Sequence, residues 1–76
     1  MKQPIQERKL AALAQRFRKA AGKTRAEAAR DMRVSQVSIF HAEESPEQSL
    51  AKLRVRMIEE YSPFRVVCPV YLLKRK

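Results

Sequence analysis

Apolar residues recur at helical spacing over most of the chain. The first such run lies between Pro4, a residue tolerated at the first position of a helix, and Gly22, which suits the left-handed residue that ends one. Its apolar positions are three or four residues apart and form one face: Leu10, Leu13, Ala14, Phe17 and Ala21. The pattern therefore predicts an amphipathic helix from near Pro4 to Gly22.

Two shorter helices are expected next. Thr24 and Glu27 have the spacing of a capping box, in which each side chain bonds the backbone N–H of the other residue. The second helix then turns Ala28, Ala29 and Met32 inward, and the small residues let a neighbouring helix come close. The turn that follows consists of Arg33 and Val34.

The third helix begins after Ser35 and has an unusual pattern. Only Ile39 and Ala42 fall on an inward face. Four residues are left outside, and two of them are apolar: Gln36, Val37, Phe40 and His41. An apolar outer face is typical of a helix that contacts another molecule.

A fourth helix is expected to start at Ser45–Gln48, which supplies a cap, a first-position proline, an acidic first turn and a capping-box glutamine. Its core stripe is Leu50, Leu53, Met57 and Tyr61, widened by Ala51, Val55 and Ile58. The stripe is wider than one packing face needs. We expect the C-terminal segment or a second subunit to cover part of it.

After Pro63 the pattern changes to that of a strand over Phe64–Leu73, followed by a basic end, Lys74–Lys76, that we expect to fray or to contact phosphate. No turn signal divides the segment, so a hairpin is not expected. A lone strand leaves its backbone groups unpaired, which favours pairing with the same strand of a second copy. Pro69 would then face away from the partner or sit at a bulge. The predicted dimer contacts are Phe64, Val66, Val67, Val70, Tyr71 and Leu72. The alternative is an extended tail packed on its own subunit.

These elements predict one domain of 76 residues, mainly α, with a helical core over residues 4–62 and a C-terminal dimerisation strand and basic tail over 63–76. A chain this short buries only about 60% of its unfolded surface and is often stabilised by a partner subunit.

Charge favours a polyanionic partner. The net charge is +9, and residues 1–41, with ten basic and three acidic side chains, carry +7 of it. Clustered positive charge attracts nucleic acid by steering and by release of counterions. Solubility alone is the plainer explanation, but it does not require clustering.

Several classes of protein are disfavoured. A single cysteine, Cys68, cannot form an internal disulfide, and it is expected to pack rather than to react. One Cys and one His cannot build a structural zinc site, and no glycine-rich phosphate loop exists. No apolar run suits a membrane span or an export signal. We therefore expect a cytoplasmic, nucleoid-associated protein that is not an enzyme and has no metal or cofactor.

Thr24 to Glu43 resembles the helix-turn-helix of the Xre/Cro/phage-repressor group. The resemblance rests on Ala29, on apolar residues at 28, 32, 34, 39 and 42, and on the run Val34-Ser35-Gln36, Ser38-Ile39 and Glu43. It extends over about residues 8 to 60. Two departures stand out. Arg33 replaces the usual glycine at a left-handed position, at a cost of about 1 kcal/mol, and Ala42 replaces a larger apolar residue.

The resemblance implies a four-helix Cro/repressor-like domain whose third helix, about residues 36–43, enters the major groove. Gln36 is then placed for adenine, Val37 for a thymine methyl, and His41 and Phe40 for base or sugar contacts. Phosphate contacts are implied for Arg25, Ser35 and Ser38, and more weakly for Lys23 and Arg33. Arg18 and Glu43 resemble the pair that ties the first helix to the third, although a plain surface ion pair is the alternative.

The function that follows is sequence-specific binding of double-stranded DNA by a homodimeric transcriptional regulator, most simply a repressor, at an inverted repeat with half-sites about 34 Å apart. The small size suits a phage or plasmid. The alternative is an antitoxin-like or adaptor protein whose C-terminal strand binds a different protein. RNA binding is disfavoured, because no sheet carries an aromatic stacking platform.

Overall fold

The structure, a computed structural model, describes residues 5–67 and 71–76. A short 3-10 turn, η1 (Glu7–Lys9), leads into four helices and two strands. The helices are α1 (Leu10–Ala20), α2 (Arg25–Met32), α3 (Gln36–Glu44) and α4 (Ala51–Tyr61), and the strands are β1 (Phe64–Val67) and β2 (Leu72–Arg75). The mainly α fold expected from the sequence is confirmed for this part of the chain.

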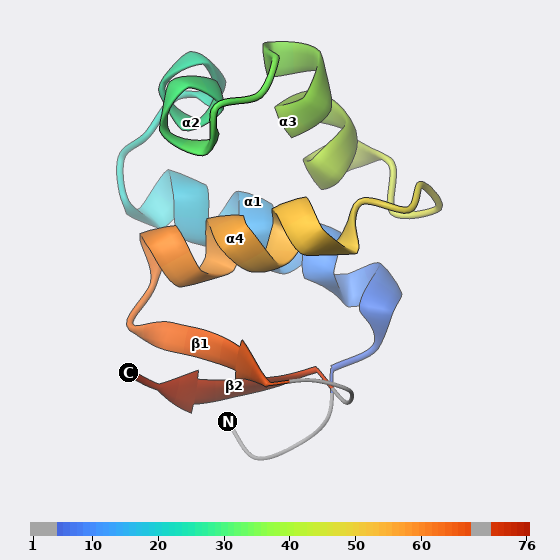
Figure 1. The fold of residues 1–76 in the computed structure, drawn as a ribbon, viewed down its shortest axis with the longest axis vertical. Coiled ribbons are helices and arrows are strands. Elements are labelled where there is room, and N and C mark those ends of the chain that lie inside the picture. The colour runs from blue at the N-terminus through green and yellow to red at the C-terminus, as the bar shows by residue number, and fades with distance from the viewer. Residues whose placement is uncertain (1–4, 68–70) are drawn as a thin grey trace.

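The elements are arranged along the longest axis of the molecule. Helices α2 and α3 lie at one end, α1 and α4 lie in the middle, and the two strands lie at the other end (Figure 1). The extents along the principal axes are 31 × 25 × 17 Å. Helix α3 and the strands are therefore separated by the layer of α1 and α4.

The core forms where the apolar faces of the four helices meet. Its fully buried members include Leu10 of α1, Ile39 of α3 and both Met57 and Ile58 of α4. The face predicted for the first helix is correct at Leu10 and Ala14, whereas Ala21 is exposed. Gly22 has φ +73°, which confirms the left-handed end expected there. The predicted start near Pro4 lies outside the described residues.

The predicted start of the fourth helix is wrong. Residues 46–49 form a turn and a bend, and α4 begins at Ala51. The helix starts late because of Arg54, nine residues after Ser45. The Arg54 guanidinium donates to the backbone carbonyls of Ser45 at 2.7 Å and Gln48 at 2.9 Å. These bonds hold the segment in a turn, and they outweigh a favourable local capping sequence.

The predicted single strand is also wrong. β1 and β2 pair antiparallel within one chain, with Val66 opposite Leu73 and Val67 opposite Leu72. The pairing satisfies the backbone groups that had suggested an intermolecular ribbon. The sequence between the strands, Cys68-Pro69-Val70-Tyr71, contains no Gly or Asn to mark a turn. Residues 68–70 lie outside the described part, so the expectations for Cys68, Pro69 and Val70 concern residues that are not described.

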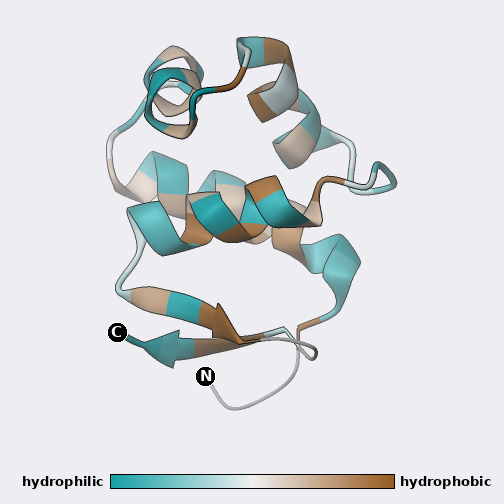
Figure 2. Cartoon of the chain, in the orientation of Figure 1, coloured by the Kyte–Doolittle hydropathy of each residue, from teal (hydrophilic) through white to brown (hydrophobic). Residues whose placement is uncertain are grey.

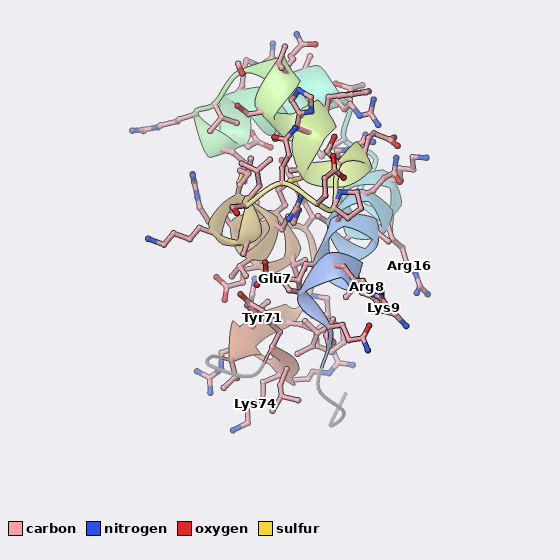
Figure 3. All side chains as sticks on the ribbon, turned by 90° about the vertical axis from the view of Figure 1, so that its right-hand side faces the viewer. Glu7, Arg8, Lys9, Arg16, Tyr71 and Lys74 are labelled. Carbon is pink, nitrogen blue, oxygen red and sulfur yellow. The ribbon has the colours of Figure 1, made fainter. Side chains whose placement is uncertain are left out.

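One face of the hairpin completes the core. Phe64, Val66 and Tyr71 pack against it around the buried Leu73, and the Phe64 ring lies 6.1 Å from that of Phe17. Tyr71 also donates to Glu7 at 3.3 Å (Figure 3). Three of the residues predicted to contact a second copy thus contact their own subunit.

The basic C-terminus is ordered into the fold, and the expectation that it frays is wrong. Lys74 and Arg75 belong to β2, the Lys76 backbone donates to Pro63 at 3.0 Å, and its ammonium donates to the Glu59 carbonyl. Figure 2 shows the hydropathy of β2 changing from apolar to hydrophilic toward this end.

Candidate nucleic-acid interface

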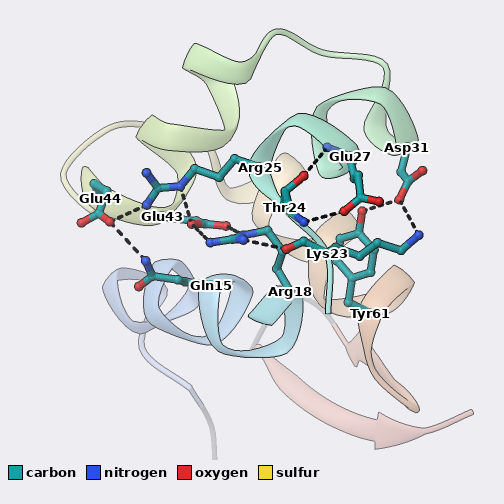
Figure 4. Close-up of polar contacts among 10 residues, drawn as sticks. All are labelled: Gln15, Arg18, Lys23, Thr24, Arg25, Glu27, Asp31, Glu43, Glu44 and Tyr61. Carbon is teal, nitrogen blue, oxygen red and sulfur yellow. Dashed lines mark hydrogen bonds and ion pairs between the residues drawn. The ribbon is translucent and has the colours of Figure 1, made fainter. Parts of the chain in front are cut away.

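Helix α2 begins with the predicted capping box. The Glu27 backbone donates to the Thr24 hydroxyl at 3.1 Å, and the Thr24 backbone donates to the Glu27 carboxylate at 2.9 Å (Figure 4). The bonds from Thr24 lower the pKa of Glu27 below its ordinary value. The start of α2 is therefore fixed by its own first turn.

The turn between α2 and α3 passes through a left-handed residue. Arg33 has φ 59° and ψ 46°, which confirms the expectation for this position. Such a conformation costs a non-glycine residue about 1–2 kcal/mol. The turn is supported by a bond from the Val34 backbone to the Ala29 carbonyl at 3.0 Å and by one from Arg56 to the Met32 carbonyl at 2.7 Å. The Arg33 side chain itself is exposed.

Helix α3 is capped by Ser35, whose hydroxyl accepts from the Ser38 backbone at 3.1 Å and lies 3.0 Å from the Ser38 hydroxyl. Its inner side consists of Ile39, Ala42 and Glu43, all buried. The first two were predicted from the sequence, whereas the burial of Glu43 was not.

The outer side of α3 is exposed and partly apolar. Val37 is 63% exposed and Phe40 is 45% exposed, and they are the only exposed large hydrophobic residues in the described part of the chain. Gln36, beside Val37 in the first turn of α3, is exposed as well. Exposed apolar residues gathered on one helix indicate a contact surface.

His41, one turn further along α3, is half-buried. Its Nδ1 lies 3.2 Å from the Ser45 hydroxyl and 3.3 Å from the Gln48 amide nitrogen, and its ring meets that of Phe40 edge-on at 5.5 Å. These contacts hold the ring beside the outer face of α3.

Arg18 and Glu43 form the predicted bridge between α1 and α3. Arg18 donates from Nε to Glu43 Oε2 at 2.5 Å and from Nη2 to Oε1 at 3.0 Å, and its Nη1 donates to the Lys23 carbonyl at 2.7 Å (Figure 4). Both residues are buried, with 6% and 5% exposure. The plain surface ion pair is therefore wrong, because a buried, two-point pair fixes the position of the helix that carries it.

Arg25, expected to contact phosphate, is already paired with carboxylates. Its Nε donates to Glu43 Oε1 at 3.0 Å and its Nη2 to Glu44 Oε2 at 2.6 Å, and the guanidinium lies 5.1 Å from the centre of the Phe40 ring. The hydrogen bond to Glu43 raises the pKa of Arg25. Gln15 also donates to Glu44, at 3.1 Å. The sequence did not predict this cluster, because Gln15, Arg25 and Glu44 are far apart in the chain.

The remaining residues predicted to contact phosphate lie just before α2 and in the turn between α2 and α3. Lys23 precedes α2 and its ammonium lies 3.9 Å from the Asp31 carboxylate, while Arg33 and Ser35 lie in the turn before α3. Arg16 of α1 and Arg30 of α2 are exposed.

Arg54 is the residue of most structural weight that the sequence interpretation passed over. It is fully buried, and it donates to the carbonyls of Ala42, Gln48 and Ser45 at 2.8, 2.9 and 2.7 Å. Burial lowers its pKa. A signal was present, since Arg54 is four residues after Leu50 and three before Met57, on the core stripe itself.

Comparison of the chain with protein-family models, with curated proteins and with solved structures finds no match. Among the described residues, no helix is both long and apolar enough to cross a bilayer. Within residues 5–67 and 71–76, no three His, Cys, Asp or Glu side chains are grouped to hold a metal ion.

Proposed function

We propose that this chain is a sequence-specific double-stranded DNA-binding regulator, most simply a repressor, whose α3 enters the major groove. The observation that carries the proposal is the outer face of α3, where Gln36, Val37 and Phe40 are exposed together. Exposing Val37 and Phe40 forgoes the stabilisation that their burial would give, and exposed apolar side chains on one helix favour contact with another molecule.

The net charge of the whole protein, +9, supports a phosphate-rich partner. Residues 23–44 carry four acidic side chains, which match four basic ones: Lys23, Arg25, Arg30 and Arg33. Of these basic residues, Arg30 and Arg33 are exposed and form no ion pair with another described residue. Basic side chains beside an α-helix of suitable width provide the sequence-independent part of DNA affinity.

Base reading is assigned to the outer residues of α3. Gln36 is suited to a bidentate contact with adenine, and Val37 to the methyl group of thymine. His41 lies one turn further along and is assigned a base edge or phosphate, and Phe40 a sugar or methyl group. Ser35 and Ser38 are assigned to phosphate at the start of the helix.

A homodimer formed through the C-terminal hairpin belongs to the same proposal. Val67 and Leu72 face each other across the two strands, are half-buried, and do not belong to the apolar core of their own subunit. Because the hairpin and α3 lie at opposite ends of the molecule, two copies must stand side by side for both α3 helices to meet one face of DNA (Figure 1).

The test is selection of bound duplexes from a random DNA pool, repeated with Gln36→Ala. We expect one enriched motif for the wild type, and loss of preference at one base position for the variant with little change in salt dependence. The matched control is Gln6→Ala, because Gln6 is an exposed glutamine that precedes η1 and is not on α3. This variant should enrich the same motif as the wild type. Absence of any enriched sequence would contradict the proposal.

The second candidate is an antitoxin-like or adaptor protein that binds another protein near the hairpin. A shallow, mostly apolar hollow of about 480 Å³ beside α4 favours it; its lining is Ala51, Lys52, Val55, Arg56 and Tyr71. This candidate predicts that substitutions on the outer face of α3 leave binding of the partner protein unchanged, whereas Val55→Glu abolishes that binding.

A further inference from the structure

Four charged side chains meet where the start of α2 approaches the end of α3: Arg18, Arg25, Glu43 and Glu44. The Glu43 side chain is 0% exposed, and both of its oxygens accept bonds from arginine. The Glu44 side chain is 43% exposed and its Oε2 accepts from Arg25 and Gln15 (Figure 4). The two carboxylates therefore differ sharply in how firmly they are held.

The charges balance in two steps. Arg18 and Glu43 cancel each other inside the protein, and Arg25 adds a second positive charge to Glu43 from the surface side. Glu44 neutralises this surplus at the surface. The Arg25 side chain is 31% exposed and the Glu44 side chain 43%, so solvent reaches this pair, whereas the Glu43 side chain is 0% exposed.

We infer that Glu44 is an exchangeable counter-ion for Arg25, and that a DNA backbone phosphate takes its place on Nη2 when the protein binds DNA. The Nε bond to Glu43 is kept during the exchange. This inference rests on the proposed function and names the atom pair that changes partner.

The geometry suits such an exchange. Carboxylate and phosphate oxygens accept from a guanidinium with the same geometry, so Arg25 need not move far. Glu43 below and the Phe40 ring at 5.1 Å already fix the guanidinium beside α3. The displaced Glu44 carboxylate then lies close to an anionic backbone, which opposes binding. Glu44 accordingly limits the affinity of the protein for DNA of any sequence.

The experiment measures binding to a mixed-sequence DNA duplex over a range of salt concentrations. Glu44→Gln should bind about two- to fivefold more tightly than the wild type, the range expected from loss of one surface ion pair. Glu47→Gln is the matched control, because Glu47 is exposed three residues further on and makes no hydrogen bond to another described residue. It removes the same charge without freeing Arg25.

A double-mutant cycle isolates the Arg25–Glu44 pair. In an Arg25→Gln background, Glu44→Gln should give no more than the effect of Glu47→Gln. The wild type offers an independent readout: on addition of duplex, the NMR signal of the Glu44 carboxyl carbon should shift, while that of the buried Glu43 carboxyl should not.

The outcomes separate the two proposals. If the wild type binds duplex but Glu44→Gln and Glu47→Gln behave alike, or the Glu44 carboxyl signal stays unchanged, the exchange is wrong and DNA binding stands. If neither wild type nor variants bind duplex at low salt, the proposed function fails and the exchange fails with it.

Discussion

Arg54 on α4 donates a hydrogen bond from Nε to the backbone carbonyl of Ala42 in the last turn of α3, at 2.8 Å and fully buried. Its two remaining bonds go to Ser45 and Gln48 in the segment that joins the two helices. One side chain thus serves one buried carbonyl, that of Ala42, and two partly buried ones, those of Ser45 and Gln48.

Removing this side chain should destabilise the domain strongly. Arg54→Met keeps much of the apolar stem but leaves the buried Ala42 carbonyl without a donor, at about 1–3 kcal/mol. It also removes two further bonds to the partly buried carbonyls of Ser45 and Gln48, which cost less because water can replace the donor. We expect a total loss of about 2–4 kcal/mol, measured by chemical denaturation. Lys52→Met, an exposed residue of the same helix, should change stability little. A variant as stable as wild type would show that the connecting segment does not depend on Arg54.

The Arg18–Glu43 bridge gives a second prediction. Arg18→Ala leaves the Glu43 carboxylate buried with only Arg25 as a partner, so stability should fall by about 3–5 kcal/mol and DNA affinity should fall with it. Arg18→Met/Glu43→Leu, which removes both charges, should recover part of the stability but not the affinity. Arg16→Ala on the exposed side of α1 is the control. An unchanged melting temperature for Arg18→Ala would refute the role of the bridge.

Glu27 predicts a dependence of stability on acid. Its folded-state pKa is lowered by the Thr24 bonds, so its contribution is fully present above its ordinary pKa of 4.5 and disappears as the pH falls through the lower folded value. Glu27→Gln retains the capping geometry without the charge. Between neutral and acid pH, the melting temperature of this variant should therefore fall less than that of the wild type. An equal fall for both proteins would mean that the Glu27 charge does not contribute to stability.

Arg33→Gly should separate stability from binding. Glycine relieves the left-handed backbone but makes the unfolded chain more flexible, so a net gain of about 0.5–1 kcal/mol is expected. Loss of the guanidinium should at the same time weaken DNA binding. Arg30→Ala, which removes a charge from the exposed side of α2, should lower affinity less. If Arg33→Gly is less stable than the wild type, the Arg33 side chain makes a stabilising contact in the folded protein.

Leu72→Glu tests the dimer. It places a charge beside Val67, outside the apolar core, and should convert dimers to monomers in sedimentation experiments without unfolding the chain. Val37→Glu on α3 should leave the oligomeric state unchanged and abolish DNA binding. If the wild type is already monomeric at all concentrations, the dimer is excluded.

Features that depend on a few neighbouring residues could be predicted from the sequence. The Thr24–Glu27 box, the Ser35 cap and the left-handed Gly22 and Arg33 each occupy one turn of chain, and all are confirmed. The local signal is sufficient there because both partners of each hydrogen bond lie within a few residues.

Features that depend on distant residues could not be predicted. The start of α4 is decided by Arg54 rather than by the capping signal at Ser45, and the two strands pair although no Gly or Asn stands between them. The site shows the same division: the outer face of α3 follows from periodicity, whereas the pairing of Arg25 with Glu44 joins residues 19 positions apart.

Three arginines outside α3 bond its C-terminal end. Arg18 of α1 and Arg25 of α2 donate to the Glu43 side chain, and Arg54 of α4 donates to the Ala42 carbonyl. A helix rises about 1.5 Å per residue, so a small rotation about this end displaces Gln36 several times further than it displaces His41. The position of the first turn of α3 therefore depends on arginines outside the helix. If α3 reads bases as proposed, we expect substitutions in the middle of the protein to alter base preference without changing any residue on the outer face.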